Sequence, residues 1–452
     1  MLNLENLVSL CKRRGFIFPG SDVYGGFAGT WDFGPLGVML KKNLMDLWWH
    51  YWVEKRDDIY GLDAAILMNP RTWVASGHTA TFADPLIECQ ACKSRFRADK
   101  IAEGISEGVS TEEFLATHTK CPVCGQESWG PIRKFNMMFS THVGAVLPED
   151  TAENSDLAQR SVAYLRPETA QGIFTNYKNV VDTFYPSLPF GLAQQGKAFR
   201  NEISPRDFIL RDRECSQMEI EYFVHPDSWE TEFEKLLQET HHFLENVIGL
   251  NPALLHDYEV PASDRAHYSE RTVDFMFAYP NGEEELMGLA YRTDFDLKNI
   301  ERESGKSMEY RDKITGEAFV PHVIEPSIGV ERLFLAVLSS AYSEEPVEGK
   351  DETRTVLKLP AALAPYQFCV SPLLKNKPEL VAKAQSVYSL LKEKYTFVTW
   401  DDSGNIGKRY RKQDEIGTPK CVVIDFDTLS DDTVTVRDRD TALQTRVPIS
   451  EL

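Results

Sequence analysis

The sequence has no long apolar run. None of its segments reaches the roughly 18 consecutive apolar residues that a membrane-spanning helix needs. The opening residues, Met1-Leu-Asn-Leu-Glu-Asn6, also lack the basic region, apolar region and small-residue cleavage site of a secretory signal peptide. We therefore expect no membrane association and a cytoplasmic location. The length of 452 residues leads us to expect about three domains of about 150 residues each.

Basic residues are scarce relative to acidic ones. The chain has 49 Lys and Arg against 69 Asp and Glu, a formal net charge of −20. Such a balance argues against nucleic-acid binding through bulk charge, because phosphate neutralisation supplies most non-specific affinity. A local basic patch can still hold a folded RNA, and Lys408-Arg-Tyr-Arg-Lys412 is a candidate. The same run also fits a solvated helix face, so both interpretations stay open.

The sequence has only eight cysteines, and four of them form two Cys-x-x-Cys pairs. Cys89-Gln-Ala-Cys92 and Cys121-Pro-Val-Cys124 form two Cys-x-x-Cys knuckles, with 111–118 between them predicted as a short helix. In a reducing compartment this pattern indicates metal binding rather than disulfides. Four thiolates suit a closed, structural zinc site; reduced thiols without metal are the alternative.

A predicted hairpin lies near the middle of the chain. The segment 190–202 and the segment 211–223 both alternate with period two, which predicts two antiparallel strands joined by a loop. Gln217, Glu219 and Glu221 would share one face, and Met218, Ile220 and Tyr222 the other. Arginines around the loop suit a polyphosphate, because the guanidinium offers paired donors and a permanent charge. A polar face that meets water is the alternative.

Further elements follow from the positions of apolar residues, glycine and proline. Expected helices cover a segment with apolar residues from Leu40 to Trp52, then 169–177, 229–250 and 330–342, the last with Arg332 in its first turn. Expected strands cover 60–68, a segment around 274–279, 283–291 after an Asn-Gly turn, and one that ends at Gly329.

The alternation of strands and helices in the C-terminal part predicts a small α/β domain with a mixed sheet. Residues 342–351 are acidic and contain proline and glycine, which indicates a linker. Strands are expected at 361–370, 396–400 and 421–425, helices at 378–394 and 406–416, and a hairpin at 433–449.

Several motifs resemble one family, and they stand in that family's order. They are Gly25–Gly37, Arg166–Gly172, Phe199–Glu202 followed by Arg213–Glu219, Arg292–Leu297 and Glu325–Arg332. Together they resemble the dimeric glycyl-tRNA synthetases of the class II aminoacyl-tRNA synthetases. The resemblance implies an α+β catalytic domain built on an antiparallel sheet at 1–350, with a zinc-knuckle insertion at 89–130 and another insertion at about 224–275. It also implies an anticodon-binding domain at 351–452.

The resemblance implies ATP-dependent attachment of glycine to tRNA(Gly) through glycyl-adenylate, with Mg²⁺ as a cofactor. It further implies a homodimer, built on the helix that includes Leu40 to Trp52 and the strand after it; a buried core helix in a monomer is the alternative. Two rival functions stay open. One is a class II synthetase for another amino acid, and the other is a tRNA-binding paralogue without catalysis.

The family's functional residues can be carried over to matching positions. Arg200, Glu202 and Arg332 would be catalytic, and Glu285 and Glu325 would meet magnesium. The expected ATP-binding residues are Arg200, Asn201, Glu202, Leu210, Arg211, Asp212, Arg213, Glu214, Cys215, Glu285, Leu286, Gly329, Val330, Glu331 and Arg332. The expected glycine-binding residues are Arg97, Glu168, Cys215, Ser216, Gln217, Met218, Glu219, Arg292, Glu325, Pro326, Ser327, Ile328 and Gly329.

Two positions depart from the family pattern. Cys215 stands where an aromatic residue usually stacks on adenine, and Tyr291 stands where a small polar residue is more usual. Both are expected at the substrate site, with Tyr291 able to cover the base in place of the missing ring.

Overall fold

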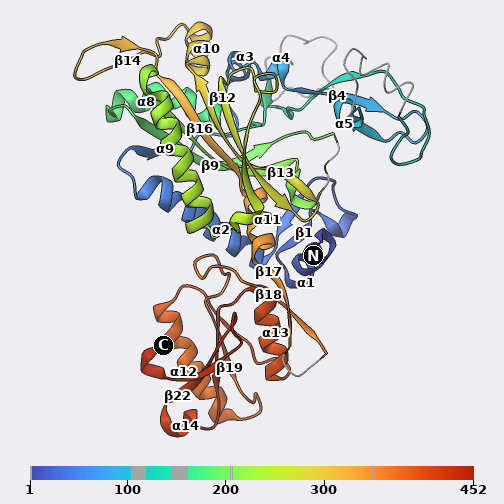
Figure 1. Ribbon diagram of the computed structural model, residues 1–452, viewed down its shortest axis with the longest axis vertical. Helices are drawn as coiled ribbons and strands as arrows, with labels where there is room; N and C mark the ends of the chain where they lie inside the picture. Colours follow the sequence, from blue (N-terminus) through green and yellow to red (C-terminus); the bar gives the residue numbers. More distant parts are fainter. Residues whose placement is uncertain (1–2, 103–118, 145–160, 204, 206, 348–350) are drawn as a thin grey trace.

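The computed structural model describes residues 3–102, 119–144, 161–203, 205, 207–347 and 351–452. A large domain with a central sheet lies above a smaller C-terminal domain in Figure 1. The expected helix at 111–118 and the segment 154–160 lie outside the described residues. No helix among the described residues is long and apolar enough to cross a membrane.

The central sheet has seven strands, and most of its neighbours are antiparallel. In spatial order they are β11 (Leu255–Glu259), β12 (Arg271–Tyr279), β13 (Gly282–Thr293), β16 (His322–Gly329), β10 (Glu214–Val224), β9 (Phe190–Phe199) and β3 (Ile59–Gly61). Only β3 runs parallel to its neighbour, β9. The predicted hairpin is confirmed as β9 and β10, which pair from Phe190↔Phe223 to Phe199↔Glu214.

The two faces of the sheet have different cores. Met218, Ile220 and Tyr222 pack on one face with α2 (Pro35–Trp49), α9 (Trp229–His242) and α11 (Val330–Ala341). On the other face, Leu192 and Phe223 pack against α8 (Ala170–Phe184). The alternation in β10 therefore separates an apolar side from a side that carries Glu219 and Glu221, as the sequence predicts.

The cysteine-containing insertion forms its own antiparallel sheet. It consists of β5 (Arg95–Arg97), β4 (Ala83–Glu88) and β6 (Arg133–Asn136), in that order, and extends to the right of the central sheet in Figure 1. The remaining helices and strands of the large domain are α1 (Leu4–Arg14), β1 (Ile17–Pro19), β2 (Trp31–Phe33), α3 (Arg71–Ala75), α4 (His78–Thr81), α5 (Ala98–Ile101), β7 (Ser140–His142), β8 (Val162–Tyr164), α10 (Phe295–Ser304), β14 (Tyr310–Arg311) and β15 (Ala318–Phe319).

The predicted strand at 60–68 is wrong beyond β3. Pairing with β9 lasts only three residues. The Trp49 ring packs against Gly61 so closely that a Cβ added there would lie 2.4 and 2.5 Å from two of the ring carbons. The predicted helix at 229–250 is shorter: α9 continues as a π-helical turn, Phe243–Val247, and ends there.

The predicted linker at 342–351 is also wrong. Tyr342–Pro346 forms β17, which pairs with β18 (Thr353–Leu357) as an antiparallel hairpin. The β-branched residues Thr353, Thr355 and Val356 favour the strand β18. The acidic composition of 342–351 gives no comparable sign that β17 would pair with it.

The strand predicted at 361–370 begins only at Phe368, because Pro365, without an N–H, interrupts the segment.

The C-terminal domain is the mixed α/β domain that the sequence predicts. Its strands follow the order β20 (Val398–Trp400), β19 (Phe368–Pro372), β21 (Lys420–Ile424), β22 (Thr433–Asp438) and β23 (Gln444–Pro448). Helices α12 (Pro378–Lys394) and α13 (Ile406–Ile416) have the predicted bounds, and α14 (Thr428–Asp431) is a short addition. Pro378 starts α12, and Gly417, in the left-handed region, ends α13.

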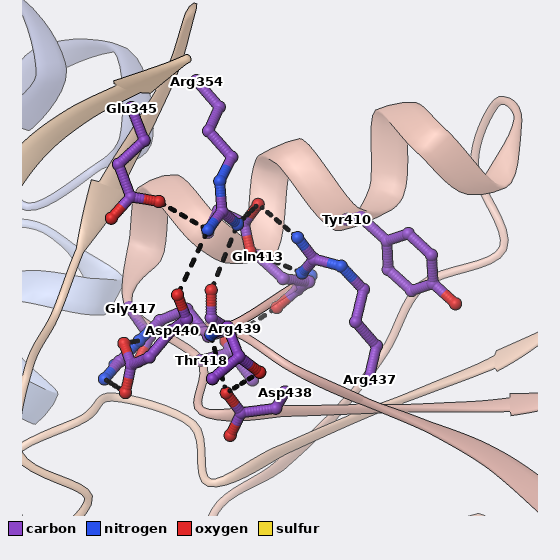
Figure 2. Close-up of polar contacts among 12 residues, drawn as sticks. Glu345, Arg354, Tyr410, Gln413, Gly417, Thr418, Arg437, Asp438, Arg439 and Asp440 are labelled. Atoms are coloured by element: carbon purple, nitrogen blue, oxygen red, sulfur yellow. Dashed lines mark hydrogen bonds and ion pairs between the residues drawn. The ribbon is translucent and has the colours of Figure 1, made fainter. Parts of the chain in front are cut away.

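An arginine network joins the β17–β18 hairpin to the C-terminal domain (Figure 2). Arg354 of β18 pairs with Asp414 of α13 at 3.1 Å and with Glu345 of β17 at 2.6 Å. Asp414 is 1% exposed and also accepts two hydrogen bonds from Arg437 of β22. Because a buried carboxylate is held by two guanidinium groups, this contact orients α13 relative to the hairpin.

Candidate active site

A cavity of about 600 Å³ opens on the face of the sheet opposite α2 and α11. Strands β10, β13 and β16 form its floor, the β4–β6 insertion forms one wall, and residues 260–268 form another. The alternation along each strand directs every second side chain into the cavity. The floor therefore combines residues that lie more than 100 positions apart in the sequence.

Many of the expected site residues line this cavity. They are Arg97, Glu168, Arg200, Glu202, Leu210, Arg211, Asp212, Cys215, Gln217, Glu219, Glu285, Leu286, Glu325, Ser327, Gly329, Glu331 and Arg332. The others do not line it: Asn201, Arg213, Glu214, Ser216, Met218, Arg292, Pro326, Ile328 and Val330. Met218 and Ile328 show the reason, since they point into the core on the opposite face.

Glu168 and Glu219 bring two carboxylates to one side of the cavity. Glu219 accepts hydrogen bonds from the hydroxyls of Thr169 and Ser327, the latter at 2.7 Å. Glu168 lies 3.4 Å from Nε2 of His78. Burial raises the pKa of Glu168, but the charges of His78, Arg292 and Arg200 outweigh this effect and lower the pKa to about 2. Glu168 is therefore ionised at neutral pH and can accept a hydrogen bond from a cation.

Glu325 is held by Arg292, which is almost completely buried. Nη1 of Arg292 donates to both carboxylate oxygens of Glu325 at 2.9 Å, while Nε and Nη2 donate to Asp296 at 2.8 and 3.0 Å. The exposure of Arg292 is 2%. Arg292 thus holds Glu325 in place and does not itself line the cavity. The carboxylate oxygens of Glu219, Glu221 and Glu325 lie close enough together to hold a metal ion.

Glu221 lies on the same side of β10 as Glu219, but it does not line the cavity. It is completely buried, and neither of its carboxylate oxygens has a hydrogen-bond partner among the described residues. Burial raises its pKa well above the usual range, and the charge of Glu325 adds to the effect. A neutral Glu221 removes one negative charge from a crowded group of carboxylates.

The other part of the cavity carries guanidinium groups. Arg332, in the first turn of α11, donates to the Glu285 carbonyl at 2.6 Å and lies 3.2 Å from its carboxylate. Nε of Arg200 donates to the Pro167 carbonyl at 3.0 Å. Burial raises the pKa of Glu202 despite the nearby arginines. This end of the cavity is suited to an anionic, multiply charged ligand.

Arg97 comes to the cavity from the insertion. It ends β5 and lies 3.2 Å from Asp84 and 2.7 Å from Asp99. The insertion thereby supplies a cation to the wall opposite the central sheet.

The two departures from the family pattern lie on opposite faces. Cys215 lines the cavity, and its thiol donates to the Ala198 carbonyl at 3.7 Å. Tyr291 stacks on Trp229 of α9, with ring centroids 3.9 Å apart, and contacts His322. The expectation that Tyr291 touches the substrate site is therefore wrong, because Tyr291 packs in the core on the helix side while its neighbour Ala290 lines the cavity.

Cys215 borders a polar corner of the cavity. Lys41 of α2 bonds to Glu331 at 2.6 Å and to the Ser216 hydroxyl at 2.8 Å. Asp212 is 7% exposed, and one of its carboxylate oxygens has no hydrogen-bond partner among the described residues. Burial, followed by the charge of Glu331, raises the pKa of Asp212 to about 8.

Some residues of the cavity were not identified from the sequence as site residues. Thr272 and Asp274 of β12 line it, as do Asp264, Arg265 and Tyr268 of the preceding loop. The alternation of β12 could have indicated Asp274. The loop 260–270 has no periodic pattern, so only the fold brings it over the cavity.

The four cysteines of the two knuckles come together as predicted. The sulfurs of Cys89 and Cys124 lie 3.7 Å apart, and those of Cys92 and Cys121 lie 3.6 Å apart. All four sulfurs lie within 4.8 Å of one another. This grouping fits tetrahedral thiolate coordination of a metal ion such as zinc.

The basic run at 408–412 is not one continuous patch. Arg409 is 2% exposed and donates to the backbone carbonyls of Pro372, Asp402, Ser403 and Gly404. Arg411 and Lys412 pair with Glu352 and Asp401. Arg409 therefore has a structural role in orienting the start of α13.

Comparisons with known proteins agree with this architecture. Residues 155–341 match the family model "tRNA synthetase class II core domain (G, H, P, S and T)", and residues 367–452 match "Anticodon binding domain". Prolyl-tRNA synthetase from Cryptosporidium parvum, solved with halofuginone and AMPPNP, has a TM-score of 0.63 over 99% of this chain and 75% of its own. At 13% identity, that likeness supports the fold alone.

Full-length relatives are much more similar in sequence. Glycine--tRNA ligase of Caldanaerobacter subterraneus is 46% identical over 100% of this chain and 97% of its own length. Glycine--tRNA ligase of Clostridium acetobutylicum is 47% identical over 99% of this chain and 97% of its own. With its class II core and its anticodon-binding domain, the chain belongs to the glycine--tRNA ligase family of class II aminoacyl-tRNA synthetases.

Proposed function

We propose that this chain attaches glycine to tRNA(Gly) in two ATP-dependent steps. The glycine carboxylate would attack the α-phosphate of ATP, which forms glycyl-adenylate and releases pyrophosphate. A terminal ribose hydroxyl of the tRNA would then attack the activated carbonyl, with AMP as the leaving group. The family relationship supports both steps.

The observation that carries this proposal is the separation of charge within one cavity. Glu168, Glu219 and Glu325 lie together on the floor, while Arg200 and Arg332 serve another part of it. An ammonium group would neutralise the carboxylates, and a polyphosphate would neutralise the arginines. A free amino acid and ATP are together the simplest pair of ligands with these charges.

The residue roles come from the family resemblance, and the lining of the cavity supports them. Arg200 would hold the α-phosphate, and Arg211 and Arg332 would hold the outer phosphates. Glu202 and the wall around Cys215 would contact the adenine end. No side chain is needed as a nucleophile, because positioning and charge stabilisation supply most of the rate enhancement in such a transfer.

Magnesium and zinc have separate candidate sites. Glu285 and Asp274 both line the cavity, and burial together with the Glu285 charge raises the pKa of Asp274 to about 7, as expected for two close carboxyls. Such hard oxygen ligands suit magnesium, which would neutralise phosphate charge when bound. Cys89, Cys92, Cys121 and Cys124 would hold a structural zinc that stabilises the insertion.

We also propose a homodimer and an anticodon-binding role for the C-terminal domain. Val23, Tyr24, Phe27 and Val38 expose 53 to 90% of their surface near the start of the chain, as residues of an interface would in the isolated chain. Measuring the mass in solution tests the dimer.

The anticodon-binding role is tested by comparing the tRNA affinity of the full chain with that of a chain ending at Ala364. The shorter chain keeps the β17–β18 hairpin and the core residues up to Ala364.

Charging of tRNA tests the proposed function as a whole. Purified protein with ATP, Mg²⁺, tRNA and labelled glycine should give acid-precipitable glycine bound to tRNA. Arg332→Ala should remove most of this product without loss of the fold. If the unmodified protein forms no glycyl-tRNA, the chain is a binding paralogue or acts on another amino acid.

A further inference from the structure

The ring of Tyr268 lies beside the carboxylates of the cavity. It belongs to the loop between β11 and β12, and it lines the cavity together with Glu168 and Glu325. The other floor residues near these carboxylates, Ser327 and Ala290, are small. A bulky aromatic wall on this side therefore comes from the loop rather than from the sheet.

Tyr268 is fixed in position by Arg292. The guanidinium carbon of Arg292 lies 3.8 Å from the centroid of the Tyr268 ring, a close cation–π contact. The ring of Phe174 lies 5.3 Å from the same carbon. Asp296 and Glu325 hold the edge of the guanidinium, so Tyr268 rests on a rigid, fully bonded group.

These contacts place the ring next to the proposed ammonium site. Nη1 of Arg292 is 2.9 Å from Glu325, and the ring lies directly against the same guanidinium. Tyr268 also lines the cavity beside Glu168 and Glu325. An amino acid whose ammonium group binds there has its α-carbon one bond away, within reach of the ring.

We infer that Tyr268 is a specificity-determining residue, whose ring excludes amino acids that carry a side chain on the α-carbon. This inference rests on the proposed function, because it concerns the amino acid bound by the same cavity. Glycine has no Cβ and would fit beneath the ring. Alanine or serine would have to displace a ring that Arg292, Phe295 and His267 support.

Selectivity, rather than activity, tests this role. Amino-acid-dependent ATP–pyrophosphate exchange is measured with glycine, alanine and serine in Tyr268→Ala, Tyr268→Leu and Tyr268→Phe. Tyr268→Ala should lower the glycine-to-alanine ratio of kcat/KM by about 10- to 200-fold, the usual discrimination for one methyl-sized group. Tyr268→Leu should lower it less, and Tyr268→Phe should retain the ratio of the unmodified protein.

Tyr258 provides a matched control. It lies on β11, is 44% exposed and does not line the cavity, so Tyr258→Ala should leave the ratio unchanged. The inference is overturned if folded Tyr268→Ala loses glycine and alanine exchange in equal proportion, or keeps the original ratio. If the unmodified protein shows no glycine-dependent exchange, the proposed function fails instead, and the two failures are thus distinguishable.

Discussion

Nη1 of Arg292 donates to both carboxylate oxygens of Glu325 at 2.9 Å, and the pair is buried at the floor of the cavity. The contact joins β13 to β16 and fixes one of the three carboxylates of the proposed glycine site. Asp296 completes the arrangement from α10. The cavity therefore depends on a residue that does not line it.

Replacement of Arg292 should destabilise the protein strongly. Arg292→Ala leaves Glu325 and Asp296 buried without their cation, which typically costs about 3 to 5 kcal/mol. Urea unfolding of the large domain measures the loss. Lys298→Ala is the control, because Lys298 is exposed and its ion pair with Asp294 should contribute little. Equal, small effects of both changes would contradict this interpretation.

Zinc should be lost when one knuckle cysteine is replaced. Elemental analysis should find about one zinc per chain in the unmodified protein, as four thiolates bind one ion. Cys121→Ser should abolish stoichiometric zinc, whereas Cys215→Ser, which lies outside the cluster, should retain it. Absence of zinc from protein prepared with the metal would leave the four thiols without the proposed role.

Asp212 should make stability depend on pH. Its pKa is about 8 in the folded protein, above the ordinary value of 3.8, so the folded chain holds a proton that the unfolded chain releases between these values. The free energy of unfolding should therefore fall as pH rises toward 8, by up to about 1.4 kcal/mol per pH unit from this group. Asp212→Asn stays neutral and should lack this contribution.

The measurement compares unfolding of the two proteins across the window from about pH 5 to about pH 8. The stability of Asp212→Asn relative to the unmodified protein should rise steadily through it. Parallel curves would show that Asp212 is ionised in the folded state, in contact with a cation such as Lys41 or Lys197.

Cys215→Phe should tighten ATP binding. Cys215 lines the cavity, so an added ring would extend toward the ligand and could stack on adenine, a gain of about 1 kcal/mol or roughly fivefold in affinity. The ATP dependence of glycine activation measures this. Tyr291→Phe, on the opposite face, should leave the ATP dependence unchanged. Weaker ATP binding in Cys215→Phe would indicate overpacking instead.

Local patterns predicted much of the fold. The alternation of β10 assigned Glu219 and Met218 to opposite faces, and proline and glycine marked the bounds of α12 and α13. Pairing between distant segments was harder to predict. The acidic stretch after Tyr342 forms a strand because β18 is available as its partner, which no local signal reveals.

The candidate site shows the same division. Motifs identified many of the carboxylates and arginines that line the cavity, but they could not show which arginine lines it. Arg292 was expected at the substrate, whereas two carboxylates from other segments bind all the nitrogens of its guanidinium. Tyr268 was missed because its loop has no periodicity and reaches the cavity only through the tertiary fold.

Amino-acid-dependent ATP–pyrophosphate exchange tests the central claim most directly. Glycine should support exchange, and alanine and serine should be weaker by at least about tenfold. Glu219→Ala should abolish the glycine-dependent signal while the protein remains folded, because Glu219 is one of the three carboxylates that would bind the ammonium group. Exchange that prefers another amino acid, or normal glycine-dependent exchange in folded Glu219→Ala, would contradict the assignment of this cavity to glycine.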